Sequence, residues 1–329
     1  MAKLQLSLAM GDYDRNRPLI DGVVAIDGVD PVIMTLSPEE MFFRAMRQEA
    51  FDITELSLSS FVLRTARGDC PYVGIPAFVS RAFRHTSIIV RSDSGITRPE
   101  DLAGRRVGIA EWQLTANVWA RALLEDYGVK LSDIAWVRGG IEERGRIEKV
   151  EIQLPPGIRI EDIGPDKTLK DMLAAGEIDA FMGPRPPTSF TPDNPDLRWL
   201  FEDPTSEAMR YYERTRLFPI MHLIGVRKSL AEKHPWLPMA VLKAFEASKA
   251  RALDHLADTS ATKVTLPFVE EQLARARKLM GNDFWPYGLE ENRHALDYFL
   301  RHHHAQGISN RLVATDELFH PGTRERFKI

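Results

Sequence analysis

The chain is poor in cysteine: Cys70 is the only one among 329 residues. An intrachain disulfide is therefore excluded, and stability requires no oxidising compartment. No motif that carries a general base surrounds Cys70, so we interpret it as a packing residue ahead of Pro71 rather than as a nucleophile.

Long hydrophobic runs are lacking too. No segment approaches the roughly 18 apolar residues of a membrane span. The N-terminal stretch MAKLQLSLAMGDYDR has only a few apolar residues in a row, is interrupted by Gln5, and has neither the hydrophobic region nor the cleavage site of a secretory signal. We therefore expect a cytoplasmic protein with no membrane partner.

Basic residues are not in excess, since the formal net charge is -4. A nucleic-acid surface needs a basic face that would raise this total, so we expect no nucleic-acid partner. With 44% hydrophobic and 27% charged residues, the chain has the composition of a globular protein with a full core.

Motifs for common cofactors are missing as well. The chain contains no CxxC, HExxH or Walker-type loop, and Gly139-Gly140 is not a dinucleotide fingerprint. The run His302-His303-His304 ends an expected helix, where cations suit the helix dipole, and consecutive helical residues point in different directions. No cofactor is expected, while a divalent metal held by histidines and carboxylates in the site stays open.

What the chain does contain is an alternation of short β-like runs with amphipathic helical stretches, which predicts an α/β fold. The expected strands are residues 4–8, 31–36, 51–56, 88–90, 107–110, 136–137, 178–182 and 218–226. Ser37 followed by Pro38 is typical of a helix start. Further helices are expected from Thr115 onward and at 169–175, and the charged stretch 140–163 is expected to form a surface hairpin.

The order of these elements resembles the type II periplasmic-binding-protein fold. The stretches that carry the resemblance are VRSDS at 90–94, PEDLAGRRVGI at 99–109, GEIDAF at 176–181 and GVRKSLAEKHPW at 225–236. The resemblance implies two lobes with a ligand cleft between them. We expect residues 1–92 plus 217–329 to form lobe I and residues 93–216 to form lobe II.

Other stretches resemble one enzyme family, the 4,5-dihydroxyphthalate decarboxylases. They are GDYDRNRPLIDG at 11–22, FDITELSLSS at 51–60, FVSRAFRHTSI at 78–88, VGIAEWQLTANVWARALL at 107–124 and FPIMHLIGVRKS at 218–229. The resemblance implies a carboxy-lyase of aromatic catabolism and phthalate degradation. Its substrate would be an aromatic dicarboxylate, 4,5-dihydroxyphthalate, its product would be protocatechuate, and the family suggests a homo-oligomer.

The implied reaction makes definite demands on the site. Loss of carbon dioxide from an unactivated ring would leave an aryl carbanion, so a proton is expected to add first to the ring carbon that bears the departing carboxylate. The hydroxyl para to that carbon then releases its proton, and departure of carbon dioxide restores aromaticity. The route requires cations for two carboxylates, an acid above the ring carbon, an acceptor for the hydroxyl proton and a dry cleft.

For the cations we expect Arg15 and Arg84 first, with Arg81 and Arg185 as further candidates. Guanidinium groups bind carboxylates in bidentate fashion, and each of these residues lies at a strand end or near a predicted crossing between lobes. Roughly two of the four are expected to serve surface or structural ion pairs instead, because exposure is the usual fate of arginine.

For the acid, His85 and His222 are the candidates, since each lies in or near a predicted crossing strand. A histidine beside carboxylates can hold a proton at neutral pH. The alternative for each is a core position with its ring nitrogens bonded to the backbone.

For the acceptor, Glu55 is the candidate because it ends a strand of otherwise buried residue types, with Asp12 or Asp14 as substitutes. A helix cap or an ion pair is the alternative role for Glu55.

Hydroxyl groups and aromatic rings complete the set of candidates. Four hydroxyl residues near expected helix starts could seat a carboxylate: Ser57, Ser59, Ser60 and Thr115. Trp112 and Tyr13 could hold the substrate ring between them, or could serve packing alone.

The main rival hypothesis is a solute-binding protein that captures an aromatic or other organic acid without turnover. It predicts the same fold and the same arginines, but a solute-binding protein should also carry an export or lipoprotein signal. Two further rivals are an enzyme similar to the thiamin-pyrimidine synthases of the same superfamily and a non-catalytic ligand sensor.

Overall fold

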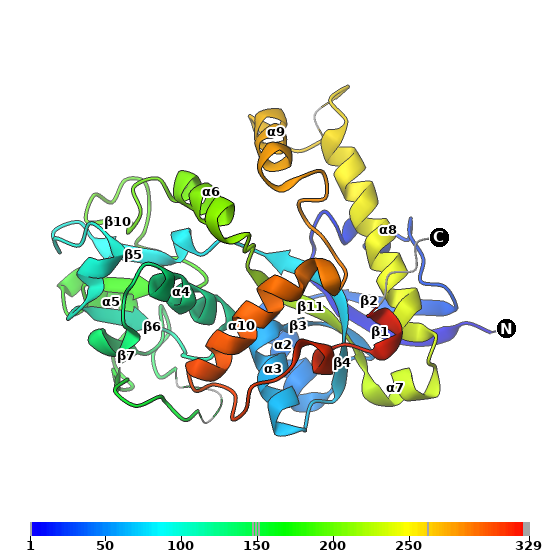
Figure 1. The fold of residues 1–329 in the computed structure, drawn as a ribbon, viewed down its shortest axis with the longest axis horizontal. Helices are drawn as coiled ribbons and strands as arrows, with labels where there is room; N and C mark the ends of the chain where they lie inside the picture. The colour runs from blue at the N-terminus through cyan, green and yellow to red at the C-terminus, as the bar shows by residue number, and fades with distance from the viewer. Residues whose placement is uncertain (1, 147, 149, 151, 262, 325–329) are drawn as a thin grey trace. The chain divides into compact units, whose positions relative to one another are not determined.

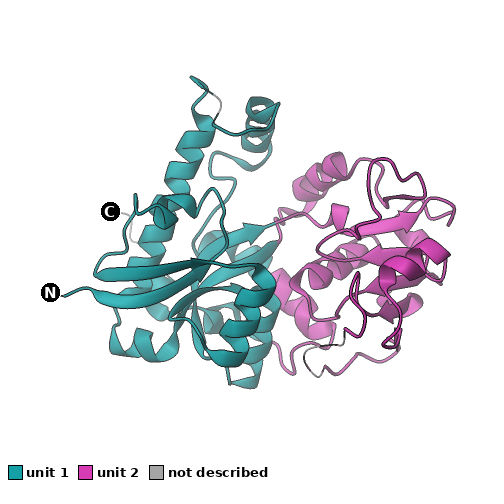
Figure 2. Ribbon diagram, turned by 180° about the vertical axis from the view of Figure 1, so that it is seen from behind, with its two compact units in different colours: residues 1–81, 220–296, 313–329 teal, residues 82–219, 297–312 magenta. Residues whose placement is uncertain are grey.

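The computed structural model describes residues 2–146, 148, 150, 152–261 and 263–324. They form two compact units, shown in Figure 2. Unit 1 comprises residues 1–81, 220–296 and 313–329, and unit 2 comprises residues 82–219 and 297–312. Each unit has its own β-sheet with helices packed on it, so the predicted α/β class is confirmed.

The sheet of unit 1 has five strands in the order β2-β1-β3-β11-β4. Their bounds are β1 (Leu4–Met10), β2 (Val29–Thr35), β3 (Ile53–Ser57), β4 (Tyr72–Arg81) and β11 (Ile220–Arg227). β1 runs parallel to β2 and β3, whereas β11 is antiparallel to both β3 and β4. The carboxyl ends of β1 and β3 therefore meet the beginning of β11, which is the edge where open α/β sheets place their ligands.

The sequence pattern predicts no strand over β4, and the reason lies in its composition. Gly74 and Pro76 interrupt the apolar run, and both residue types are depleted in strands. β4 nevertheless pairs with β11, and the pairing register shifts on both sides of His222.

Helices of unit 1 pack on this sheet or on one another (Figure 1). They are α1 (Arg17–Ile20), α2 (Pro38–Gln48), α3 (Leu58–Arg67), α7 (Lys228–Lys233), α8 (Leu237–Ala257), α9 (Val269–Met280) and α11 (Thr315–Leu318), with the 3-10 turns η4 (Glu290–Asn292) and η5 (Pro321–Thr323). α2 and α3 pack against β3, α8 packs against β4, and α9 lies beside α8 rather than on the sheet. The predicted start of α2 is confirmed, because the Ser37 hydroxyl accepts a hydrogen bond from the Glu40 N–H and Pro38 follows.

The sheet of unit 2 has six strands in the order β10-β5-β9-β6-β7-β8. Their bounds are β5 (Ile88–Arg91), β6 (Arg106–Ile109), β7 (Ala135–Arg138), β8 (Ile160–Asp162), β9 (Ala180–Met182) and β10 (Leu197–Trp199). The helices are α4 (Thr115–Asp126), α5 (Leu169–Ala175) and α6 (Pro204–Thr215), with the 3-10 turns η1 (His85–Ser87), η2 (Pro99–Leu102) and η3 (Leu131–Asp133). α10 (Arg293–Ala305) begins in unit 1 and ends in unit 2.

Two expectations about this unit differ from the structure. Residues 82–92 were expected in lobe I, but β5 pairs with β9 and β10 and so belongs to the sheet of unit 2. The charged stretch 140–163 is expected to form a surface hairpin, but its residues 160–162 form β8, which pairs in parallel with β7 and extends the sheet. Residues 147, 149 and 151 of this stretch lie outside the described residues. Residues 297–312 also lie in unit 2, because α10 continues into it.

Apolar side chains fill the interior of both units. In unit 2 one core cluster includes Ile89, Val137, Leu169 and Phe181, which come from two strands, a helix and a third strand. Of the helices among the described residues, none is long and apolar enough to cross a membrane.

Candidate active site

The predicted residues Glu55 and His222 meet in unit 1. His222 Nδ1 lies 2.6 Å from Glu55 Oε1, and their strands β11 and β3 are direct neighbours in the sheet. Glu55 is fully buried, whereas the His222 side chain keeps 17% of its surface exposed. Among the described residues no hydrogen bond reaches His222 Nε2, so the nitrogen opposite Glu55 is the one that a ligand could contact.

Further hydrogen bonds hold the Glu55 carboxylate. The Gly11 N–H donates to Oε2 at 2.8 Å, and the Tyr13 hydroxyl donates to Oε1 at 2.9 Å. Burial alone would raise the pKa of Glu55, but the bonds from His222, Gly11 and Tyr13 outweigh it and lower the pKa below its usual range. Burial, followed by the charge of Glu55, raises the pKa of Tyr13, which therefore remains a hydrogen-bond donor.

The turn after β1 explains why these donors reach Glu55. Gly11 has no side chain, and a Cβ there would lie 2.4 Å from the ring of Tyr13. The absence of that atom lets the ring fold back over the turn. Asn16, which is fully buried, donates from Nδ2 to the Gly11 carbonyl at 3.0 Å and closes the turn.

Arg15 lies against two aromatic rings in the same unit. Its Cζ is 4.3 Å from the ring centroid of Tyr13 and 4.4 Å from that of Trp285. Its Nη1 lies 3.1 Å from the carboxylate of Asp14. The other predicted aspartate, Asp12, pairs with Arg17 at 3.2 Å on the surface and contacts neither histidine.

Two serines are the cross-strand neighbours of His222 in the sheet. His222 is registered with Ser57 on β3 and with Ser80 on β4, and cross-strand partners present their side chains to the same face of a sheet. Phe42 adds an edge-on contact to the His222 ring, with centroids 4.8 Å apart. Ser80, which is partly exposed, and Phe42 are not predicted from the sequence as site residues.

The remaining candidates of unit 1 are Arg81, Ser59 and Ser60. Arg81 Nη2 donates to the backbone carbonyl of Pro286 and to the side-chain carbonyl of Asn292. Arg81 is buried. Ser59 is fully buried in the first turn of α3, and Ser60 follows it. The expectation that these serines open a helix is confirmed.

Arg84 is the predicted cation of unit 2 that is buried most deeply. Its Nη1 donates to the Ser87 hydroxyl at 3.4 Å, and its Nε finds no partner in the described part of the chain. No carboxylate lies within ion-pair distance of it among those residues, and burial lowers its pKa to about 10. A buried guanidinium with so little compensation is costly, and an anionic ligand would supply what is missing.

His85, next in sequence, lies in an aromatic cage. Its ring is 5.0 Å from that of Phe201 and 5.4 Å from that of Tyr211, with Phe83 and Tyr127 farther out. Within the described residues neither ring nitrogen has a hydrogen-bond partner. Burial lowers the pKa of His85 to about 4, so the ring is neutral at pH 7.

The other candidates of unit 2 are Trp112, Thr115 and Arg185. Trp112 is fully buried between Arg121, whose Cζ is 3.7 Å from its ring centroid, and Trp136. The structure thus favours the packing alternative for Trp112. Thr115 is buried at the first position of α4, and Arg185 is exposed in the loop after β9.

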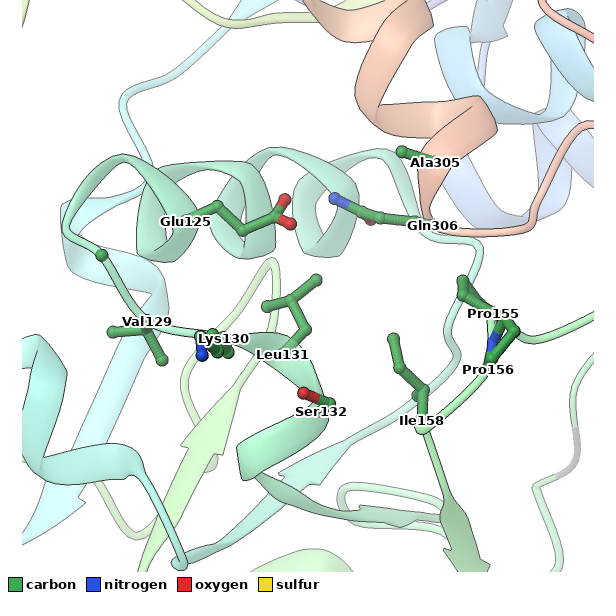
Figure 3. Close-up of a pocket in the computed structure, with 11 residues that line it drawn as sticks. Glu125, Val129, Lys130, Leu131, Ser132, Pro155, Pro156, Ile158, Ala305 and Gln306 are labelled. Atoms are coloured by element: carbon green, nitrogen blue, oxygen red, sulfur yellow. The ribbon is translucent and has the colours of Figure 1, made fainter.

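A hollow of about 390 Å³ also lies in unit 2, beside α4 and the end of α10 (Figure 3). Its lining mixes apolar side chains such as Leu131 and Ile158 with Glu125, Lys130 and Gln306. The buried amide of Gln306 is already satisfied by Arg121 and the Val118 carbonyl. The hollow therefore offers little convergent polar chemistry.

No cluster of three or more histidine, cysteine or acidic side chains suited to a metal occurs within residues 2–146, 148, 150, 152–261 and 263–324. His302 pairs with Glu125 at 2.9 Å, and His304 Nδ1 contacts the Ser309 carbonyl at 3.0 Å, so the histidine run diverges as expected. Cys70 is buried, and burial raises the pKa of its thiol, as suits a packing residue.

Unit 1 thus brings together Tyr13, Arg15, Glu55 and His222, which lie in three sequence stretches. Trp285 and Asn16, which contact these residues, are not predicted from the sequence either. Asn16 stands in the quoted stretch GDYDRNRPLIDG and could have been found there, whereas nothing in the sequence around Trp285 links it to Arg15.

Comparison with known proteins adds the following. Residues 15–150 match the model of a family described as "ABC transporter, phosphonate, periplasmic substrate-binding protein". The chain is 58% identical, over 330 residues that cover 100% of both proteins, to a 4,5-dihydroxyphthalate decarboxylase from Comamonas testosteroni. It is 54% identical over 213 residues, 64% of this chain and 83% of the relative, to a 4,5-dihydroxyphthalate decarboxylase from Pseudomonas putida.

Among solved structures, the periplasmic aliphatic sulphonate binding protein SsuA from Escherichia coli is similar with a TM-score of 0.53. The match covers 99% of this chain and 94% of SsuA at 16% sequence identity. A likeness at this identity shows the fold alone, and it confirms the expected type II periplasmic-binding-protein-like fold. The ligand cleft between lobes stays a prediction.

Proposed function

The chain belongs to the 4,5-dihydroxyphthalate decarboxylase family, and from this membership we propose that it removes one carboxyl group from 4,5-dihydroxyphthalate to give protocatechuate and carbon dioxide. The observation in this chain that best supports the proposal is the contact between His222 and the buried Glu55. Tyr13 bonds to Glu55 and packs against Arg15, so it links Arg15 to this pair.

His222 is the proposed general acid. The bond to Glu55 fixes the proton of Nδ1 and orients the ring, which leaves Nε2 to deliver a proton to the ring carbon that bears the departing carboxylate. The hydroxyl para to that carbon loses its proton and becomes a carbonyl. When carbon dioxide leaves, the electrons of the broken C–C bond return to the ring and the para oxygen regains a proton. Solvent then reprotonates His222, so that the reaction consumes one proton overall.

Glu55 acts through His222 in this scheme. The sequence suggested it as the acceptor of the hydroxyl proton, but its two oxygens already accept bonds from Gly11, Tyr13 and His222, and its lowered pKa makes it a weak base. We therefore infer that Glu55 is a positioning residue, as the carboxylate is in other carboxylate–histidine pairs.

Arg15 and Arg84 are the proposed carboxylate-binding residues. Arg15 presents a guanidinium held against aromatic rings in the unit that contains His222, and Arg84 is a buried cation that lacks an anionic partner among the described residues. Arg81 is less suited, because the Pro286 carbonyl and the Asn292 side chain already accept its hydrogen bonds.

The proposed reaction needs no external oxidant or reductant, so it requires no redox cofactor, and we propose that it proceeds without one. The cytoplasmic location and the homo-oligomer expected from the sequence stay predictions.

The test is to incubate purified, chelator-treated protein with 4,5-dihydroxyphthalate and to follow protocatechuate and carbon dioxide. Product formation supports both the decarboxylase and the absence of a required metal. Binding without product, even after divalent metals are restored, would instead favour the solute-binding protein that the match of residues 15–150 also allows.

A further inference from the structure

The pairing of β4 with β11 is irregular, and it leaves a short segment of the β4 backbone beside His222 outside the regular ladder. From His222 to Ile224 the chain advances two residues in β11, while the paired positions run across five residues in β4, from Ser80 to Ile75. Residues 76–79 are therefore outside the regular ladder, and their carbonyl groups need other donors. Bulges of this kind occur next to active sites, where they redirect side chains.

Donors from outside the sheet bond to three of these four carbonyls. Arg15 Nε donates to the Val79 carbonyl at 2.5 Å, and Trp285 Nε1 donates to the Phe78 carbonyl at 2.9 Å. The Gly288 N–H donates to the Pro76 carbonyl at 2.8 Å. One bulge thus holds both Arg15 and the segment that carries Trp285.

Trp285 is fixed at a second point as well. Its own carbonyl accepts a bond from Lys249 Nζ at 2.9 Å, and Lys249 is in turn paired with Asp283 at 3.0 Å. With its indole N–H and its backbone both held, the ring is fixed where it covers the guanidinium of Arg15 at 4.4 Å.

We propose that Trp285 is a positioning residue, which with the β4 bulge holds the Arg15 guanidinium in the plane that a substrate carboxylate requires. The proposal rests on the proposed function, in which Arg15 binds a carboxylate next to His222. A planar guanidinium that is already fixed loses less conformational entropy when it forms two parallel hydrogen bonds. Because Tyr13 contacts Arg15 and bonds to Glu55, the same packing ties the bound carboxylate to the acid.

The test compares Trp285→Leu, which removes both the ring and the indole bond, with Trp285→Phe, which keeps a ring but loses the bond to Phe78. Trp285→Leu is expected to raise KM for 4,5-dihydroxyphthalate about tenfold with kcat changed less than about threefold, and Trp285→Phe to raise KM about threefold. Trp236→Leu, at a partly exposed tryptophan of the same unit, is the matched control. Thermal unfolding of each variant checks that it folds.

A double-mutant cycle separates positioning from general destabilisation. In an Arg15→Ala background, Trp285→Leu is expected to cause little further rise in KM, because its effect passes through Arg15. An unchanged KM in Trp285→Leu, or an equal rise in both backgrounds, overturns the proposal while decarboxylation by the wild type still stands.

The dissociation constant of phthalate, which carries both carboxylates but no hydroxyl groups, is measured in parallel. If the wild type binds phthalate but forms no protocatechuate from 4,5-dihydroxyphthalate, the proposed function fails, and a rise in the phthalate dissociation constant in Trp285→Leu that is absent in the Arg15→Ala background still supports the role of Trp285. If the wild type neither forms protocatechuate nor binds phthalate, the role of Trp285 is overturned too.

Discussion

The two candidate histidines lie in opposite surroundings. His222 in unit 1 bonds to the buried carboxylate of Glu55 and keeps part of its ring exposed. His85 in unit 2 is buried among aromatic rings, and within the described residues neither ring nitrogen is bonded. Both follow conspicuous stretches of the sequence, FPIM and SRAFR, and both were equal candidates for the acid.

The difference shows that the partner of a histidine decides its chemistry. The carboxylate at Nδ1 orients the His222 ring and leaves Nε2 available to a ligand. Burial in the aromatic cage instead lowers the pKa of His85 and keeps that ring neutral. A similar contrast separates Arg15, which has backbone and aromatic partners, from Arg84, which has one long bond to a hydroxyl. Unit 1 thus resembles a site that is already assembled, whereas in the described part of unit 2 the buried charge of Arg84 has no anionic partner.

Among the variants that test the contrast between the two histidines, replacement of His222 is expected to have the largest effect on kcat. His222→Gln is expected to lower kcat by about 10²- to 10⁴-fold, because it removes the only proposed acid, while phthalate binding changes little. The measurement is steady-state decarboxylation together with calorimetric binding of phthalate. His85→Gln is the matched variant and should keep kcat within about tenfold of the wild type. A larger loss in His85→Gln than in His222→Gln would reverse the assignment.

Removing the charge of Glu55 tests whether support of the ring matters. Glu55→Gln is expected to lower kcat by roughly 10²-fold, since a neutral amide orients and stabilises the protonated ring less well than a carboxylate does. Glu40→Gln, at a surface carboxylate paired with Arg44, provides the control. If Glu55→Gln is folded and as active as the wild type, then Glu55 does not act through His222.

Arg84 is tested by separating ligand binding from stability. Arg84→Met is expected to weaken phthalate binding by about 10- to 100-fold, as loss of a charge-assisted carboxylate contact would do. Without ligand its melting temperature should stay the same or rise, because a buried and poorly compensated charge is removed. Arg98→Met, at an exposed side chain, is the control. Unchanged phthalate binding would show that Arg84 has no role in recognition.

The cage around His85 predicts a pH dependence of stability. The pKa of His85 is about 4 in the folded chain and near 6.5 when unfolded, so the unfolded state binds the proton more readily. The stability held at pH 7 is therefore lost as pH falls from 6.5 toward 4, by about 2 kcal/mol at pH 5. The measurement is urea unfolding at pH 7 and pH 5, in which His85→Leu should lose less stability on acidification than the wild type. His294→Gln, at an exposed histidine, should lose as much as the wild type. Equal losses in His85→Leu and the wild type would mean that His85 is not held neutral.

Much of the fold could be predicted from the sequence because its signals are local. The alternation of strands and helices, the Ser37-Pro38 helix start and the helix after the strand that contains Glu55 all depend on neighbouring residues. β4 could not be predicted, since its glycine and proline contradict strand propensity and its place comes from pairing with a strand about 150 residues away.

For the site, the sequence by itself determined which residue types were available and that the stretches beginning at Gly11, Phe51 and Phe218 belong to one family. Only the tertiary structure shows that the Glu55 carboxylate is bonded to Gly11, Tyr13 and His222, and that His85 is enclosed by aromatic rings. The physical reason is that a pKa, an ion pair or a stacked ring depends on distances of a few ångströms between residues such as 55 and 222. The covalent chain places those residues far apart, and sheet pairing brings them together.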